Sequence, residues 1–457
     1  MMNVIAIDSL RSLPFSAVYG FSLVFYYSLA SLVFFIPIAL VSAELATGCS
    51  SRGGIYLWVR EAFGERWGFL TIWLQWIYNV VWYPTILAFI AGALAYLINP
   101  ALTNNKIYML SAILLLFWFA TLINCFGMRW SSLVSTLGAL VGTLMPMLLI
   151  IVLGTLWFYQ GKPLQITFTH QAFWPVLSNL NNLSFLIAVL FGLIGVEMSA
   201  VHADEVHNPD KTYPLAIFYS CLLIIFSLVF ASLAIAIVVP QKQLNLITDL
   251  IAAFMIFFNA YHMLWMKPII TLLIIIGGMS GVAAWVIGPT KGLVVAAQEG
   301  SAPAWFGKVS RSGVPLNLLL LQAIILTLLC TVFLLLPSVS SSYWVLTAIT
   351  AQLALFVYIL MFAAVIRLRY KKRQTQPAYK IPGGRWVVWL VAGIGILSCL
   401  AAIGLGFIPP TQIKVGSILR YETILVVGIL ALCAPPFIIQ AINKFLPQRL
   451  VNSTETK

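Results

Sequence analysis

Long apolar segments fill most of this chain, and short polar segments separate them. A helix needs about 20 apolar residues to cross a bilayer, whereas a membrane strand alternates polar and apolar residues over about ten positions. The apolar segments here are continuous, so they predict helices. We expect about twelve membrane-spanning helices, at residues 2–19, 22–46, 67–97, 107–126, 131–159, 182–205, 213–239, 267–297, 315–336, 342–369, 386–408 and 422–446.

The first and the sixth of these segments contain residues that suit a membrane helix poorly. The first holds two charged residues, Asp8 and Arg11. The sixth holds two glycines, Gly192 and Gly195, followed by the carboxylate Glu197. Glycine weakens a helix, and an ionisable side chain at membrane depth is a candidate functional group by default. These two segments are therefore predicted to be discontinuous.

Breaks at matching positions in the two halves of a chain are typical of a transporter site built from discontinuous helices. Free N–H groups at the start of a half-helix suit a carboxylate, and freed carbonyl groups suit an ammonium group. The pattern therefore predicts a site for a zwitterionic amino acid. The alternative is that the glycines only allow close helix packing. The coincidence of the two breaks favours the site.

Composition excludes a soluble protein. The chain is 62% hydrophobic and 8% charged, with a mean hydropathy of +1.02. A soluble domain has about 25% charged residues. Most of this chain must therefore face lipid or other helices.

The net charge of +13 indicates orientation in the membrane rather than a nucleic-acid partner, because the charges lie between apolar segments. With the N-terminus placed in the cytoplasm, 18 of the 25 Lys and Arg residues lie inside, six lie outside, and Arg11 lies within the first span. Cytoplasmic loops carry an excess of Lys and Arg. Both termini are therefore expected in the cytoplasm.

The six cysteines and four histidines form no spacing that suggests a metal, redox or haem site. We expect no cofactor, no metal ligand and no catalytic residue, so the chain is not expected to be an enzyme. A membrane-embedded enzyme would need His pairs or Asp/His clusters within its spans. A channel would need repeated filter-like segments, and the sequence shows none.

Several segments, in this order and spacing, resemble the amino acid–polyamine–organocation (APC) superfamily, and most closely its glutamate/γ-aminobutyrate antiporter branch. The resemblance runs from about Ala6 to about Gln440. It is carried by the sequences at 20–25, 43–47, 53–59, 195–197, 208–216, 285–292 and 381–384.

The resemblance implies an all-α polytopic membrane protein with two inverted repeats of five helices (a LeuT/APC-like fold) and two peripheral helices. In this chain the single transporter domain would be 1–457. The repeats would be 1–159 and 182–369, the peripheral helices 386–446, and a short cytoplasmic tail 447–457. The first helix is expected to be short or truncated, because only seven residues precede Asp8. The doublet Met1-Met2 would then be an internal start.

The resemblance also places the substrate between the broken first and sixth helices and side chains of the eighth and tenth. Two family positions differ here: the eighth-helix glutamate is Gly281 and a tenth-helix tyrosine is Ala354. Both changes enlarge the site and remove polar groups, so glutamate and γ-aminobutyrate as substrates become doubtful. The candidate substrate-binding residues are Ile7, Asp8, Ser9, Arg11, Leu193, Ile194, Gly195, Trp285 and Tyr358.

Several candidate site residues have two interpretations each. Asp8 and Arg11 are three residues apart, so they would pair within a helix; alternatively, Arg11 binds a substrate carboxylate. Glu197 would either carry a proton or satisfy freed N–H groups of the broken sixth helix. Trp285 and Tyr358 would contact substrate or only pack.

The cytoplasmic ends of the spans hold further charges. Glu205 and Lys211 are predicted to form a cytoplasmic gate. Glu44 is predicted to pair in the same way with Arg52 and Arg60.

The predicted function is secondary active transport of an amino acid in a bacterial inner membrane, by antiport or proton-coupled uptake with alternating access. Partners would be the lipid bilayer, the amino acid or a related amine and, as a candidate coupling ion, the proton, with no nucleic acid. The alternatives are a polyamine or amine exchanger of the same fold, and a non-transport membrane protein such as a channel.

Overall fold

A computed structural model describes residues 7–48, 54–125, 138, 140–175, 183–197, 209–240, 246–310, 313–371, 377, 379–410, 413 and 415–445. Every regular element in these residues is a helix. Ten helices are long and apolar enough to cross a membrane, and they are Gly20–Gly48, Glu65–Ile98, Lys106–Cys125, Leu140–Tyr159, Pro214–Ala236, Leu264–Gln298, Leu316–Leu335, Val339–Tyr370, Gly384–Gly406 and Ile418–Ala441. The fold is that of an all-α polytopic membrane protein, as the sequence predicted.

The two expected spans missing from this set are the first and the sixth. In place of the span at 2–19, the described residues form a 3-10 turn, η1 (Leu10–Ser12), and a short helix, α2 (Leu13–Ala17). In place of the span at 182–205 they form α12 (Leu186–Phe191), after which the chain leaves the helix. The predicted discontinuities in these two segments are therefore confirmed.

The remaining helices have bounds close to those expected. They are α3 (Leu23–Ala30), α4 (Ile36–Gly48), α6 (Glu65–Ile98), α7 (Lys106–Cys125), α9 (Met145–Tyr159), α13 (Pro209–Ala236), α15 (Lys267–Gln298), α16 (Leu316–Leu329), α17 (Val332–Leu335), α18 (Val339–Tyr370), α19 (Gly384–Gly406) and α20 (Ile418–Phe445). One π-helical turn, η3 (Ser31–Phe35), joins α3 to α4, and another, η5 (Leu140–Leu144), precedes α9.

Three helices lie in segments where no span was expected. They are α5 (Gly54–Phe63), α10 (His170–Phe173) and α14 (Asp249–Ala260). At 12 residues or fewer, each is too short to cross a bilayer. Span-length apolar patterning therefore could not find them.

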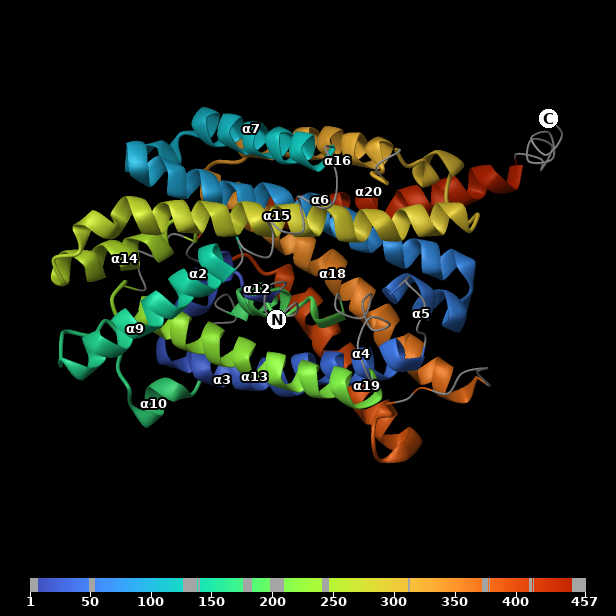
Figure 1. The fold of residues 1–457 in the computed structure, drawn as a ribbon, viewed down its shortest axis with the longest axis horizontal. Helices are drawn as coiled ribbons and strands as arrows, with labels where there is room; N and C mark the ends of the chain where they lie inside the picture. The colour runs from blue at the N-terminus through green and yellow to red at the C-terminus, as the bar shows by residue number, and fades with distance from the viewer. Residues whose placement is uncertain are drawn as a thin grey trace.

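The long helices lie in layers around α6 and α15, which run side by side along the long axis of the molecule (Figure 1). α7 and α16 cover one side of this pair, and α3, α4 and α13 lie on the other side of the molecule. α18 crosses between them at an angle, and α12 and α2 lie near the centre.

Burial separates the core helices from the periphery. In their most apolar stretches, 72% of the residues of α6 and of α18 are buried inside the protein. The corresponding share is 28% for α19 and 11% for α20. α19 and α20 therefore lie at the periphery of the chain.

A close backbone crossing joins η5 to α15 at two glycines. A Cβ atom built on Gly142 would lie 2.2 Å from the backbone nitrogen of Gly277, and one built on Gly277 would lie 2.2 Å from the carbonyl oxygen of Gly142. Small residues allow membrane helices to approach this closely. The crossing fixes the part of α15 around Gly277, which borders the site described below.

Candidate functional site

The break in the first segment places its two charged residues on different local structures. Ser9 is extended, with φ −128° and ψ 119°, and η1 begins at the next residue. The Ser9 carbonyl oxygen accepts hydrogen bonds from the Ser12 backbone N–H at 3.0 Å and from the Ser12 hydroxyl at 2.7 Å. Asp8 therefore lies before the turn and Arg11 within it.

The sixth segment breaks because its backbone changes direction at a glycine. After α12, two tight turns follow, in which the Leu193 N–H donates to Leu190 and the Ile194 N–H donates to Phe191. Gly195 then adopts a φ of +131°. Residues with a Cβ atom rarely adopt this conformation. Gly195 is therefore the residue that permits the break.

Tyr358 of α18 holds this break in place. Its hydroxyl oxygen accepts a hydrogen bond from the Gly195 N–H at 3.2 Å and donates one to Glu197 Oε2 at 2.5 Å. Tyr358 is fully buried and Glu197 is 3% exposed. This geometry favours the second interpretation of Glu197, in which the carboxylate supports the broken helix.

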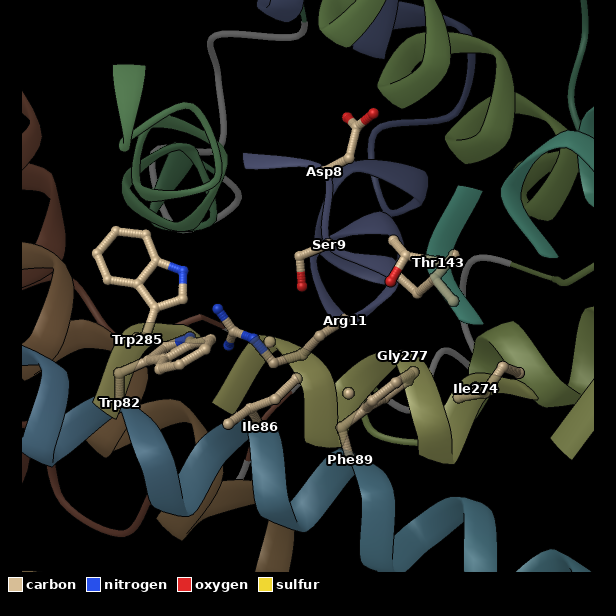
Figure 2. Close-up of a pocket in the computed structure, with 13 residues that line it drawn as sticks. Asp8, Ser9, Arg11, Trp82, Ile86, Phe89, Thr143, Ile274, Gly277 and Trp285 are labelled. Carbon is tan, nitrogen blue, oxygen red and sulfur yellow. The ribbon is translucent and has the colours of Figure 1, made fainter. Parts of the chain in front are cut away.

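A pocket lies between the first-segment break and the α6–α15 pair (Figure 2). Its enclosed free volume is about 40 Å³, and about 470 Å³ of space lies between its atoms when the opening is counted as well. Its lining residues are Asp8, Ser9, Leu10, Arg11, Trp82, Ile86, Phe89, Thr143, Ile274, Gly277, Gly278, Gly281 and Trp285. Four predicted substrate-binding residues thus meet in one pocket: Asp8, Ser9, Arg11 and Trp285.

The other predicted site residues do not line this pocket. Ile7, Leu193, Ile194 and Gly195 lie at the two breaks, and Tyr358 contacts the sixth-segment break. Glu205 and the side chain of Lys211, the predicted gate, lie outside the described residues.

Sequence reasoning missed the wall that α6 provides. Trp82, Ile86 and Phe89 follow one another at steps of four and three residues, so they share one face of the helix. That face is as apolar as the rest of α6, so no sequence signal distinguishes it. Thr143 and Ile274 of the opposite wall are equally unmarked.

The expected ion pair between Asp8 and Arg11 is wrong. Both carboxylate oxygens of Asp8 lie 3.0 Å from the Ser227 hydroxyl of α13, and Figure 2 shows the two charged side chains pointing in opposite directions. A spacing of three residues brings side chains together only in a continuous helix. The extended Ser9 removes that proximity.

Arg11 is buried without a charged partner among the described residues. Its exposed fraction is 3%, and its Nε and Nη1 atoms make no hydrogen bond. The guanidinium carbon lies 5.9 Å from the Phe15 ring centre and 5.8 Å from that of Phe191. It also interacts with the Tyr343 phenol, which carries no charge at neutral pH.

Open space and aromatic rings complete the pocket. A Cβ atom built on Gly281 would meet no atom within 4 Å. The rings of Trp82 and Trp285 lie 6.2 Å apart at 57°. In Figure 2 the Arg11 side chain extends toward the part of the pocket that these two tryptophans line.

The predicted ion pairs of Glu44 and Arg60 have different partners in the structure. Arg369 Nη2 of α18 lies 2.6 Å from Glu44 Oε2, and Arg60 of α5 pairs with Glu299, which follows α15. Arg52 lies outside the described residues. No group of three or more His, Cys, Asp or Glu side chains in the described residues could hold a metal ion.

In the described residues, ten apolar helices of span length, and a pocket beside the broken first segment, are those of a polytopic membrane protein. The family model for amino acid permeases matches residues 4–430, and the chain belongs to this family.

Three similar proteins show the range of relatives. An uncharacterized transporter of Legionella pneumophila is 57% identical, over 96% of this chain and 94% of its own length. A glutamate/gamma-aminobutyrate antiporter of Lactococcus lactis is 33% identical, over 92% and 85%. A probable agmatine/putrescine antiporter of the same species is 25% identical, over 87% and 84%.

Proposed function

We propose that the protein is a secondary active transporter that exchanges amino acids or related amines across a bacterial inner membrane. The substrate would bind in the pocket beside the break in the first segment. The observation that carries this proposal is the buried Arg11 guanidinium, which lines the pocket and has two nitrogens without partners. A ligand group is the simplest source of those partners.

Alternating access supplies the mechanism. The two broken segments would move with the substrate, while the α6–α15 pair provides a continuous wall across the pocket. Exchange follows if the empty pocket reorients slowly. An empty pocket leaves the Arg11 charge unpaired, which is costly in a membrane interior, and a bound substrate relieves that cost.

The excess of Lys and Arg in alternate loops supports cytoplasmic termini. In that orientation the contacts of Glu299 lie at the cytoplasmic end of α15. Glu299 Oε2 accepts a hydrogen bond from the Tyr56 hydroxyl at 2.7 Å and pairs with Arg60. These contacts tie α5 to α15 and would help to close the cytoplasmic side. Glu205 and Lys211 remain further gate candidates, and the proton remains a candidate coupling ion.

Counterflow in proteoliposomes tests the proposal. Vesicles are loaded in turn with each of the twenty amino acids and their decarboxylation products, and uptake of the same labelled compound is measured. We expect saturable uptake that requires internal substrate. Flux that neither saturates nor needs internal substrate would indicate a channel, and no exchange with any compound would rule out the proposal.

A further inference from the structure

The two ionisable side chains that line the pocket do not pair with each other. Arg11 is its cation, and Asp8 is its carboxylate. Asp8 points away from Arg11 and contacts Ser227. The other lining side chains are apolar or neutral. Among the described residues, therefore, no carboxylate pairs with the guanidinium, although Asp8 lines the same pocket.

A buried charge without a partner costs free energy, and proteins usually remove such a charge or pair it. Arginine cannot give up its proton in a protein, so it cannot become neutral. The partner must therefore come from outside the described protein groups. The free Nε and Nη1 atoms are hydrogen-bond donors only. The missing partner is consequently an acceptor that carries negative charge.

A carboxylate fits this position. Guanidinium groups bind carboxylates through parallel charge-assisted hydrogen bonds, which are stronger than bonds between neutral groups. The same pocket has open space at Gly281, where a Cβ atom would meet no atom within 4 Å, and two tryptophan rings line it. A diamine, by contrast, would bring positive charge next to an unpaired guanidinium.

We infer that Arg11 is the carboxylate-binding residue of the pocket and sets its substrate class: compounds with a carboxylate enter, and diamines are refused. The inference rests on the proposed transport function and narrows it. It separates this chain from relatives such as the probable agmatine/putrescine antiporter, which is 25% identical over 87% of this chain.

Ligand-dependent thermal stability of the purified full-length protein in detergent tests the inference. The probes are the twenty amino acids, their decarboxylation products, which include cadaverine and agmatine, and the diamine putrescine. We expect every compound that raises the Tm of the wild-type protein to carry a carboxylate. Stabilisation by a diamine equal to that by the best amino acid would overturn the inference.

Variants of Arg11 provide a second test of the inference. Arg11→Gln should weaken binding of the best carboxylate ligand by at least about tenfold. Arg11→Lys, which keeps the charge but loses the planar fork, should retain part of the affinity. Arg420→Gln is the matched control, because Arg420 is exposed near the start of α20 and far in sequence from the pocket residues. Unchanged affinity in Arg11→Gln would refute the assignment.

The ligand-free Tm separates binding from folding. Removal of an unpaired buried charge should leave the Tm of Arg11→Gln equal to that of the wild type or raise it. A fall would show that the guanidinium supports the fold instead.

Transport and binding can fail separately. Arg11-dependent carboxylate binding without counterflow would refute the proposed function and keep the inference. Counterflow of diamines would support the proposed function and refute the inference about Arg11. No binding by any probe at millimolar concentration would contradict both.

Discussion

Tyr358 donates a hydrogen bond to Glu197 from a helix 161 positions further along the chain, and both residues are buried. The same tyrosine oxygen accepts the N–H of Gly195, which the helix break has left without a helical partner. One phenol thus satisfies both a freed backbone donor and a carboxylate. The contact ties α18 to the broken sixth segment.

Tyr358→Phe should destabilise the protein. The change removes both hydrogen bonds and leaves a buried N–H and a buried carboxylate short of a partner. An unsatisfied buried group costs about 1–3 kcal/mol. We expect a lower Tm in detergent and slower counterflow, because the break is no longer fixed.

Tyr343→Phe is the matched control for stability. Tyr343 lies on the same helix and is equally buried, but its hydroxyl interacts with Arg11 without a hydrogen bond of standard geometry. Loss of the Tyr343 hydroxyl should lower the Tm much less than loss of the Tyr358 hydroxyl. Equal effects of the two changes would contradict a special role for Tyr358.

Glu197→Gln separates the two interpretations of this carboxylate. A glutamine oxygen still accepts the hydrogen bond of Tyr358, but the amide cannot carry a proton between the two sides of the membrane. We expect Glu197→Gln to keep most of the counterflow rate and its pH profile, and Glu197→Ala to lose stability by about 1–3 kcal/mol. A flattened pH profile in Glu197→Gln would instead assign proton transfer to Glu197.

Most of the fold could be predicted because a bilayer imposes one length and one polarity on each span. The two broken segments were also visible, since charges at 8 and 11 and glycines at 192 and 195 disturb an apolar pattern. The short helices α5, α10 and α14 were not visible. Nothing in span-length patterning separates a connecting helix from a loop.

From the residues alone the site was predictable only where it carries polar or charged side chains, and Trp285 was found through the family resemblance. Arg11 and Asp8 were found, but their pairing was wrong, because the extended conformation of Ser9 decides it and no sequence pattern encodes that conformation here. Trp82 and Phe89 were missed because an apolar pocket wall and an apolar packing face have the same composition.

Gly277→Ala should disrupt the protein through a backbone clash. The added Cβ would lie 2.2 Å from the Gly142 carbonyl oxygen, and backbone atoms cannot yield as a flexible side chain does. Overpacking of this kind costs about 1–3 kcal/mol or more. We expect a lower Tm and strongly reduced counterflow. Gly393→Ala in α19, where a Cβ meets nothing within 4 Å, should leave both near wild type.

Two ion pairs outside the pocket should differ in their contribution to stability. Glu44 is 3% exposed, and its Oε2 atom contacts Arg369 at 2.6 Å and the Ile381 N–H at 2.9 Å. Loss of one partner from a buried pair costs about 3–5 kcal/mol. Glu44→Gln should therefore lower the Tm markedly.

The comparison is Glu299→Gln, in a pair whose side chains are 29% and 36% exposed. Exposed pairs contribute about 0–1 kcal/mol, so the Tm should hardly change. The expected loss in this variant is instead in transport, through weaker closure between α5 and α15. A larger Tm loss in Glu299→Gln than in Glu44→Gln would refute this ranking.

Gly281→Glu should give Arg11 a carboxylate partner from the protein itself, in place of the carboxylate of a substrate. Position 281 lines the same pocket as Arg11, and a Cβ atom there would meet no atom within 4 Å, so a longer side chain can start into the pocket without a clash at its base. Its carboxylate would pair with the guanidinium and compete with the substrate. We expect the KM for carboxylate substrates to rise by at least about tenfold, and the ligand-free Tm to rise as the buried charge is neutralised. Gly281→Gln fills the same volume without the charge, so a KM that rises equally in both variants would show that the effect is steric and that Arg11 does not select the substrate.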